Sequence, residues 1–448
     1  MNTPTITTRI LKKFLLVLCF VFISSSCNKD DNNGVPPITE EEETIENNPL
    51  GLELQSEFTN EQDYRVVADG IFAIWWDPRF DHENDIPFML DTFKTLRQDC
   101  LNNLGMKDPP NVAAGVFFNI YIHHGERDNL PNGWGNGVGT NSFGVPYMTL
   151  PEGAHADFNN LLHEGFHIFQ YSNNSPGFAY DGDTSWYTEA TAQWYAVSRN
   201  PNAFDTFIEI GTLTSNPHLA LWHSFGNEAP GDPTDWLYQV RQYAMQAWLY
   251  YMTSQESVAE NLITDGYYSG TNLSPQEYHY QNIGSERLRE IFANWAARNT
   301  LDFDYLTRQQ VARARIELND FADFSNNKPY ALTLSGTNFI GTHNAPADLK
   351  PRSWAYNVIK LENIPNGNYT ISLNGEDEGS EGAASHFEGR FVTKGQSQVQ
   401  SFTMNSATNG SFNLTLENPV EEAYIIIASV PEQFKSAQNY GYSITISQ

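Results

Sequence analysis

Residues 159–173, NNLLHEGFHIFQYSN, place two histidines four positions apart, with a glutamate directly after the first. On a helix, residues i and i+4 project from the same face, so His163 and His167 can offer imidazole nitrogens to one metal ion. Glu164 lies one step round the helix, where its carboxylate can reach a metal-bound water without binding the metal. Zinc lowers the pKa of such a water towards about 7, and a neighbouring carboxylate can take its proton. This is the HExxH pattern.

A third metal ligand would separate a catalytic site from a chance motif, and Glu189 is the candidate. It lies 22 residues beyond His167 in TSWYTEATAQWYAVSR (184–199), which is another helical pattern. Two antiparallel helices joined by the turn-rich SNNSPGFAYDGD would return Glu189 to the histidines. Two histidines and one glutamate leave the fourth position of zinc open for water, as a catalytic site requires. Two alternatives stay open: a hydrogen-bonded polar cluster on a metal-free helix, and a peptidase-derived fold without catalysis.

HEGFH together with WYTEATA resembles the gluzincin metallopeptidases, and in particular the aminopeptidase N pattern of HExxH followed by a Trp-x-x-Glu helix. The resemblance implies that His163, His167 and Glu189 are zinc ligands, that Glu164 is the general base and that the substrate is a peptide or protein. The position four residues after Glu189 holds Gln193, where the thermolysin-like pattern has an aspartate that supports a histidine. Support of the zinc ligands is therefore an open question.

A closer likeness is to an uncharacterised, peptidase-like family of secreted bacterial proteins. That family combines an HExxHxxQ helix, ending here at Gln170, with a Trp-rich second helix and a later aromatic strand like SWAYNVIKL. The likeness covers roughly residues 65–360 and implies a gluzincin-like fold.

The zinc peptidases that this chain resembles commonly use a Tyr or His to stabilise the oxyanion of the tetrahedral intermediate. The helical pattern TDWLYQVRQYAMQAWLYYMTS (234–254) places Tyr243 and Tyr250 seven residues apart, on one face. We expect Tyr243 in the oxyanion role, with core packing as the alternative for each aromatic residue. The rival candidates are Tyr250, Tyr238, Tyr251 and His223.

The N-terminus has the form of an export signal. Arg9, Lys12 and Lys13 precede the apolar run FLLVLCFVFI, and the small residues SSS then lead to Cys27. ISSSC resembles a bacterial lipobox, which implies that residues 1–26 are removed and that Cys27 carries a lipid anchor. The following NKDD looks like the acidic signal of lipoproteins at the outer cell surface, so we expect an outer-membrane, surface-facing protein. An ordinary secretory signal with an incidental cysteine is the alternative.

The charge of the chain limits its partners. The formal net charge is −29 and becomes −32 once the three cationic residues of the signal are removed. Such a surface repels nucleic acid, so a nucleic-acid-binding role is disfavoured. After cleavage and lipidation only Cys100 remains as a free thiol, which excludes an intramolecular disulfide.

The pattern along the chain predicts an α+β protein in two folded parts. Residues 27–57 are polar and acidic and predict a disordered tether. Residues 58–325 predict the metallopeptidase-like domain, a mixed sheet plus a helical subdomain. Residues 326–448 hold seven short strand patterns between Asn, Gly and Pro turns, which predict an antiparallel β-sandwich with an accessory role.

Other patterns carry weaker expectations. VPYMTLP (145–151) predicts a strand that lines the cleft and pairs with an extended peptide. His123 and His124 end a strand, and adjacent strand residues point to opposite faces, so joint metal binding is not expected. The acidic stretches DGD (181–183) and NGEDEGSEG (374–382) lack the EF-hand spacing and predict solvated loops.

A lipoprotein that binds polysaccharide or a host protein through exposed aromatic residues is the alternative function.

Overall fold

The computed structural model describes residues 44–60, 63–201, 210–222, 241–301, 303–306, 329–434 and 437–448. Its N-terminal part contains a mixed six-stranded sheet. The strand order is β1-β2-β3-β4-β6-β5. The pairs β3–β4 and β4–β6 are parallel, and β5 pairs with β6 in the antiparallel sense at the edge of the sheet. The strands are β1 (Thr44–Asn47), β2 (Arg65–Asp69), β3 (Phe72–Trp76), β4 (Phe118–His123), β5 (Gly137–Thr140) and β6 (Pro146–Pro151).

The central strands of this sheet are largely apolar because both faces are covered. Every residue of β3 and of β4 is buried. The long helix α2 (Ile86–Asn102) follows β3 and packs on it, and the short helix α3 (Pro110–Ala114) leads into β4. Runs of β-branched and aromatic residues at 70–77, 116–124 and 145–151 predict strands, and the apolar spacing at 85–105 predicts a helix. All four are present.

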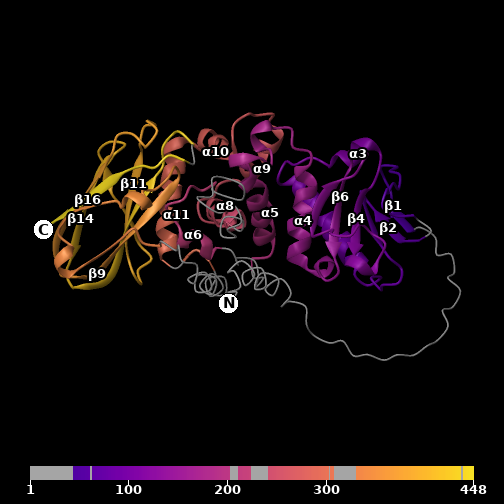
Figure 1. The fold of residues 1–448 in the computed structure, drawn as a ribbon, viewed down its shortest axis with the longest axis horizontal. Helices are drawn as coiled ribbons and strands as arrows, with labels where there is room; N and C mark the ends of the chain where they lie inside the picture. Colours follow the sequence, from indigo (N-terminus) through magenta and orange to yellow (C-terminus); the bar gives the residue numbers. More distant parts are fainter. Residues whose placement is uncertain are drawn as a thin grey trace, which may run out of the picture.

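Two helices next to the sheet contain the residues singled out above. Helix α4 (Phe158–Gln170) begins at Asp157, whose side chain accepts hydrogen bonds from the amides of residues 159 and 160. Helix α5 (Ser185–Arg199) packs against α4, and both lie between the sheet and the other helices (Figure 1). Gly165 allows close packing of α4 on α2, since a Cβ atom there would lie 2.7 Å from Leu96 Cδ1.

Further helices form the middle of the elongated molecule (Figure 1). They are α6 (Gly211–Ser215), α8 (Gln246–Ser254), α9 (Glu260–Thr264), α10 (Pro275–Ile283) and α11 (Ser285–Thr300). The helical pattern at 184–199 is confirmed by α5, and residues 285–298, which also have helical spacing, lie in α11. Of the expected helix 234–254, residues 241–254 are described and are helical apart from a turn at Met245. No described helix is both long enough and apolar enough to cross a bilayer.

Two antiparallel-rich sheets of five strands each form the C-terminal part. Their orders are β13-β14-β10-β16-β8 and β12-β11-β15-β9-β7. All seven strand patterns recognised in the sequence are strands here, so the β-sandwich is confirmed. The strands are β7 (Leu332–Ser335), β8 (Gly341–Asn344), β9 (Ala355–Ile364), β10 (Gly367–Gly375), β11 (Phe387–Thr393), β12 (Val399–Ser401), β13 (Thr403–Met404), β14 (Asn409–Leu416), β15 (Val420–Ser429) and β16 (Tyr442–Ser447).

The second of these sheets is buried on both faces. One face packs on the first sheet through residues such as Ile359 and Ile425. The other face contributes Trp354, Tyr356 and Ile426 to the same apolar core as the helices and the N-terminal sheet. Helix α11 lies directly on β11 and β15. The sandwich and the helical part therefore share one core.

The expected tether is wrong for its last residues. Strand β1 pairs with β2 in parallel, and Leu52 is buried in the core. Glu53 also forms a bridge to Val116, two residues before β4. Residues 44–57 thus belong to the folded part, because the apolar Leu52 and the strand-forming TIEN find partners there. Residues 1–43, including Cys27 and the expected signal segment, lie outside the described residues.

Candidate metal centre

The two histidines of HEGFH face one point on the surface of α4. Their Nε2 atoms lie 3.3 Å apart, as the i, i+4 spacing predicts. Bonds of about 2.0–2.1 Å to a tetrahedral zinc place two ligand atoms about 3.3–3.4 Å apart. The separation of His163 and His167 therefore suits two ligands of one ion.

Glu189 completes a triangle with these two nitrogens. Its Oε2 atom lies 3.4 Å from Nε2 of His163 and 3.4 Å from Nε2 of His167. The same oxygen is buried and accepts no hydrogen bond from any residue in the described part of the chain. A buried carboxylate oxygen without a hydrogen bond is costly unless a cation compensates it. A metal ion or a protonated histidine can compensate this oxygen. The donor set fits zinc, and the three expected ligands are brought together.

Each histidine is held in a defined orientation by a glutamine. Nδ1 of His163 donates to Oε1 of Gln193 at 2.8 Å, and Nδ1 of His167 donates to Oε1 of Gln170 at 2.6 Å. The Gln170 amide is fixed in turn, because its Nε2 donates to Thr191 Oγ1 and to the Tyr267 hydroxyl. With the proton held on Nδ1, both Nε2 lone pairs point at the metal position.

Gln193 therefore answers the question left open by the sequence. Support for His163 comes from a neutral amide at the position where the thermolysin-like pattern has an aspartate. An amide oxygen accepts the same hydrogen bond as a carboxylate but adds no negative charge. The spacing from Glu189 pointed to Gln193, but only the structure shows its amide oxygen against Nδ1 of His163.

The three side chains that form this ligand triangle, His163, His167 and Glu189, interact strongly through their charges. Burial alone would lower the pKa of His167, but the carboxylate of Glu189, assisted by that of Glu164, raises it to about 9. Burial likewise works against ionisation of Glu189, yet His167 and His163 hold the pKa of its carboxyl well below its usual range. Without metal, an imidazolium and a carboxylate face each other, so zinc must displace a proton to bind.

Glu164 lies beside the triangle and next to the edge strand. Its Oε1 atom accepts a hydrogen bond of 2.8 Å from Nδ2 of Asn136, the residue before β5. A Cβ atom on Gly137 would lie 3.8 Å from Glu164 Oε2. Glu164 is buried and does not belong to the ligand triangle, which agrees with a carboxylate that serves water rather than metal.

These residues line a cavity of about 830 Å³. Its walls come from α4, from α5, from the start of β5 and from the segment between α4 and α5. Its polar lining is rich in amides and carboxylates, and its aromatic lining consists of Tyr171, Phe178, Tyr180, Tyr243 and Tyr267. The cavity is large enough for several substrate atoms beyond the reacting group.

Tyr243 lies in the cavity, as expected, with its ring centroid 5.9 Å from that of His163. Tyr251 does not line the cavity, and its hydroxyl donates to Glu256 at 3.0 Å. Tyr250 does not line it either. The other two rivals, Tyr238 and His223, lie outside the described residues.

Tyr180 is a cavity residue that sequence reasoning missed. It belongs to the connection between α4 and α5, where no periodic pattern distinguishes it. The Tyr180 side chain is exposed, but partial desolvation of its hydroxyl in the cavity and the nearby Glu189 carboxylate raise the pKa of Tyr180, so the phenol stays protonated and can donate a hydrogen bond. Asn136 was missed for the same reason, since it lies in the glycine-rich loop before β5.

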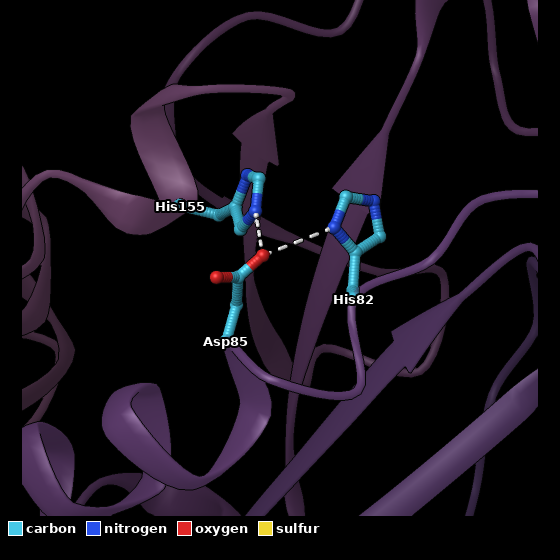
Figure 2. Close-up of side chains that lie close together, drawn as sticks. All are labelled: His82, Asp85 and His155. Atoms are coloured by element: carbon cyan, nitrogen blue, oxygen red, sulfur yellow. Dashed lines mark hydrogen bonds and ion pairs between the residues drawn. The ribbon is translucent and has the colours of Figure 1, made fainter.

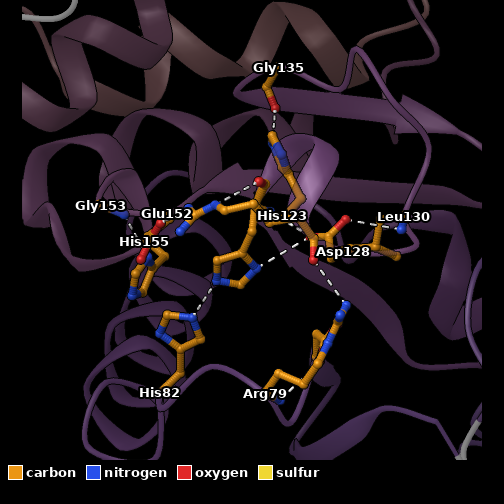
Figure 3. A network of polar contacts seen from close by, with 12 residues as sticks. Arg79, His82, His123, Asp128, Leu130, Gly135, Glu152, Gly153 and His155 are labelled. Atoms are coloured by element: carbon orange, nitrogen blue, oxygen red, sulfur yellow. Dashed lines mark hydrogen bonds and ion pairs between the residues drawn. The ribbon is translucent and has the colours of Figure 1, made fainter. Parts of the chain in front are cut away.

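The other motifs considered in the sequence do not contribute to this site. His123 contacts the carbonyl of Gly135 at 3.0 Å (Figure 3), whereas His124, the residue after β4, contacts His82 at 2.9 Å, so the two imidazoles have different partners. Cys100 is buried in the core, and burial raises the pKa of its thiol. Residues 181–183 and 374–382 contribute to neither of the two clusters of potential ligands among the described residues.

Replacing Gln193 by alanine should weaken zinc binding. Loss of such an outer hydrogen bond typically lowers metal affinity about 10- to 100-fold, because the imidazole loses its fixed tautomer and orientation. Competition with a chromophoric chelator would measure the affinity. Gln255→Ala, at an exposed position on the end of α8, is the control and should leave it unchanged. Equal affinity of wild type and Gln193→Ala would show that this hydrogen bond has no part in binding.

No family model and no curated protein matches the chain. Solved structures match part of it. The pre-peptidase C-terminal domain of a collagenase from Bacillus anthracis is 12% identical over 27% of this chain and 100% of that domain, with a TM-score of 0.18. The surface-associated copper-binding protein CorA of Methylomicrobium album BG8 is 8% identical over 26% of this chain and 98% of its own, with a TM-score of 0.17. PliG, a periplasmic inhibitor of g-type lysozyme from Aeromonas hydrophila, is 14% identical over 26% of this chain and 98% of its own, with a TM-score of 0.17. These scores are too low to bear on function.

Proposed function

We propose that the protein is a zinc-dependent metallopeptidase of the gluzincin kind. One observation carries the proposal: His163, His167 and Glu189 converge on a single point, and the Glu189 oxygen aimed at that point is buried without a hydrogen bond. Glu164 stands next to the same point in a cavity that can hold a substrate. Three protein ligands, an open fourth position and an adjacent carboxylate are the parts of a hydrolytic zinc site.

Zinc, when bound, would supply Lewis acidity and make a water acidic enough to be deprotonated near neutral pH. Glu164 takes the proton from the attacking water and delivers it to the leaving amine. The amide of Asn136 holds one oxygen of Glu164, which leaves the other free for the proton. Tyr243 and Tyr180 are the candidate donors to the oxyanion that develops on the scissile carbonyl.

The edge strand β5 is the place where an extended peptide can add to the sheet. The expectation that β6, the VPYMTLP segment, pairs with substrate is wrong, because β6 lies between β4 and β5 and both of its edges are occupied. Strand β5 has one neighbour, β6, in the order of the sheet. Backbone pairing with β5 would bring a peptide past Glu164 without requiring a particular side-chain sequence.

We further propose that the protein works outside the cell as a lipoprotein anchored through Cys27. The lipobox-like ISSSC and the acidic NKDD support this placement. Peptides or proteins at the cell surface would then be its substrates.

The test uses residues 28–448 loaded with zinc, stripped with a chelator and reloaded. Cleavage of a mixed peptide library, followed by mass spectrometry, should appear with zinc, vanish on stripping and return on reloading. Zinc bound at His163, His167 and Glu189 without cleavage of any peptide would favour the alternative, a lipoprotein that only binds its ligand. Absence of zinc from this site would refute the enzymatic proposal.

A further inference from the structure

A second cluster of potential metal ligands lies at the far end of α4 from the connection to α5. His82 and Asp85 stand in the turn that leads into α2, and His155 stands in the short helix η2 (Ala154–Ala156) just before α4 (Figure 2). The His82 carbonyl accepts hydrogen bonds from the amides of residues 85 and 86, so the side chains of His82 and Asp85 project from one turn.

The three side chains converge on one carboxylate oxygen. Oδ2 of Asp85 lies 3.0 Å from Nε2 of His155 and 3.4 Å from Nδ1 of His82. One ligand atom from each of the three residues can be chosen so that all lie within 4.8 Å of one another. The two distances to Asp85 Oδ2 are close to those between atoms bound to a single zinc-sized ion.

Asp85 is placed as a helix cap but does not act as one. It is the N-cap residue of α2, and its side chain makes no capping hydrogen bond. An aspartate at this position normally accepts from the amides of the first turn. Here the carboxylate turns to the two buried imidazoles instead, and its own side chain is 37% exposed, which leaves a path from solvent to the cluster.

The hydrogen bonds around His82 require one more proton than two neutral imidazoles carry. Nε2 of His82 lies 2.9 Å from Nε2 of His124, and Nδ1 of His124 lies 3.3 Å from Oδ2 of Asp128. With the contact to Asp85, this makes three contacts that each need an N–H group, and two neutral imidazoles supply only two. A cation at Nδ1 of His82 resolves the deficit, since His82 can then donate to His124, and His124 can donate to Asp128.

One existing contact has to change. Nδ1 of His155 accepts from the backbone amide of Gly153 at 3.1 Å, which places the ring proton on Nε2 (Figure 3). A metal on Nε2 moves that proton to Nδ1, so the Gly153 amide must turn away. Gly153 has φ of 95°, in a region that glycine adopts freely, so a change of backbone conformation costs less there than at other residue types.

We propose that His82, Asp85 and His155 bind a second divalent transition-metal ion, of which zinc is the first candidate. Two imidazoles and a carboxylate suit zinc and similar ions and are poor ligands for calcium or magnesium, which favour oxygen. The ion joins the start of α2 to the residues before α4, and these two helices pack together. Its role is structural: it fixes the entry of the helix that holds His163 and His167. The proposal does not depend on peptidase activity.

Metal content tests the proposal. Zinc per mole of residues 28–448 is measured by elemental analysis, after removal of excess metal, for wild type, for His82→Ala/His155→Ala and for the control His343→Ala in the β-sandwich. We expect the double variant to hold one ion fewer than wild type and control. Equal content in all three proteins would overturn the proposal and leave a proton shared between His82 and His124 as the missing charge.

A second experiment uses a milder substitution, so that the result does not depend on the folding of the double alanine variant. In a His163→Ala/His167→Ala background, which removes the first site, zinc is titrated calorimetrically with and without Asp85→Asn. We expect binding to the background protein and at least about tenfold weaker binding with Asp85→Asn, which keeps the shape of the side chain. No binding to the background protein, or the same affinity with Asp85→Asn, would also overturn the proposal.

Discussion

Zinc-loaded Glu164→Gln is expected to cleave peptides about 100- to 10,000-fold more slowly than wild type, the range that a general base contributes. Glutamine keeps the size of the side chain and can still contact Asn136, but it cannot take a proton from water. Zinc content should be unchanged, because Glu164 is not in the ligand triangle. The measurement is kcat/KM on a peptide found in the library screen, with zinc determined on the same sample.

The matched control is Glu126→Gln, at an exposed glutamate away from the cavity. It removes the same charge and should retain wild-type kcat/KM. Glu164→Gln with undiminished turnover would remove Glu164 from the mechanism, whatever the zinc content. Loss of zinc together with turnover would instead mean that this glutamate helps to hold the metal.

Glu189→Ala should lower zinc affinity at the first site by more than the roughly 100-fold that loss of an outer hydrogen bond can cost, because it removes a direct ligand. The two histidines that remain cannot fill a tetrahedral site alone. Affinity is best measured in a His82→Ala/His155→Ala background, so that one site is observed at a time. Undiminished zinc affinity in Glu189→Ala would place the ion elsewhere.

Glu189 also sets the pH dependence of binding. Because the metal-free His167 has a pKa of about 9, it carries a proton that zinc must displace at every pH below that value. Zinc affinity of the wild type should therefore rise about tenfold per pH unit up to about pH 9 and then level off. Without the Glu189 carboxylate the pKa of His167 falls, so the levelling should occur at lower pH.

The convergence of His163, His167 and Glu189 could be predicted from the sequence because the signals for it are local. The spacing of His163 and His167 fixes a common helix face, and a short turn-rich connection leaves few places for α5 except beside α4. The strands of the sandwich were predicted for a similar reason, since each is a short alternating or apolar run between turn residues. Both predictions depend only on residues that are close together in the sequence.

Contacts between distant segments could not be predicted in this way. Asn136 meets Glu164 from a loop 28 residues away, and His155 meets Asp85 across 70 residues of chain. Strand propensity located β6 correctly but could not show that β5 folds back outside it. Neighbours in a sheet depend on the path of the whole chain, whereas propensity depends on a few residues.

The shared core has a consequence for how this protein can be divided. Trp354, Tyr356 and Ile426 fill the same apolar core as α11 and the helices behind it. A gene fragment that stops near residue 325 would uncover the faces of α11 that β11 and β15 normally cover, and a fragment of residues 326–448 would uncover the matching sheet. Such contiguous apolar surface promotes aggregation. The sandwich is therefore better regarded as part of the helical body than as a domain that can be detached from it.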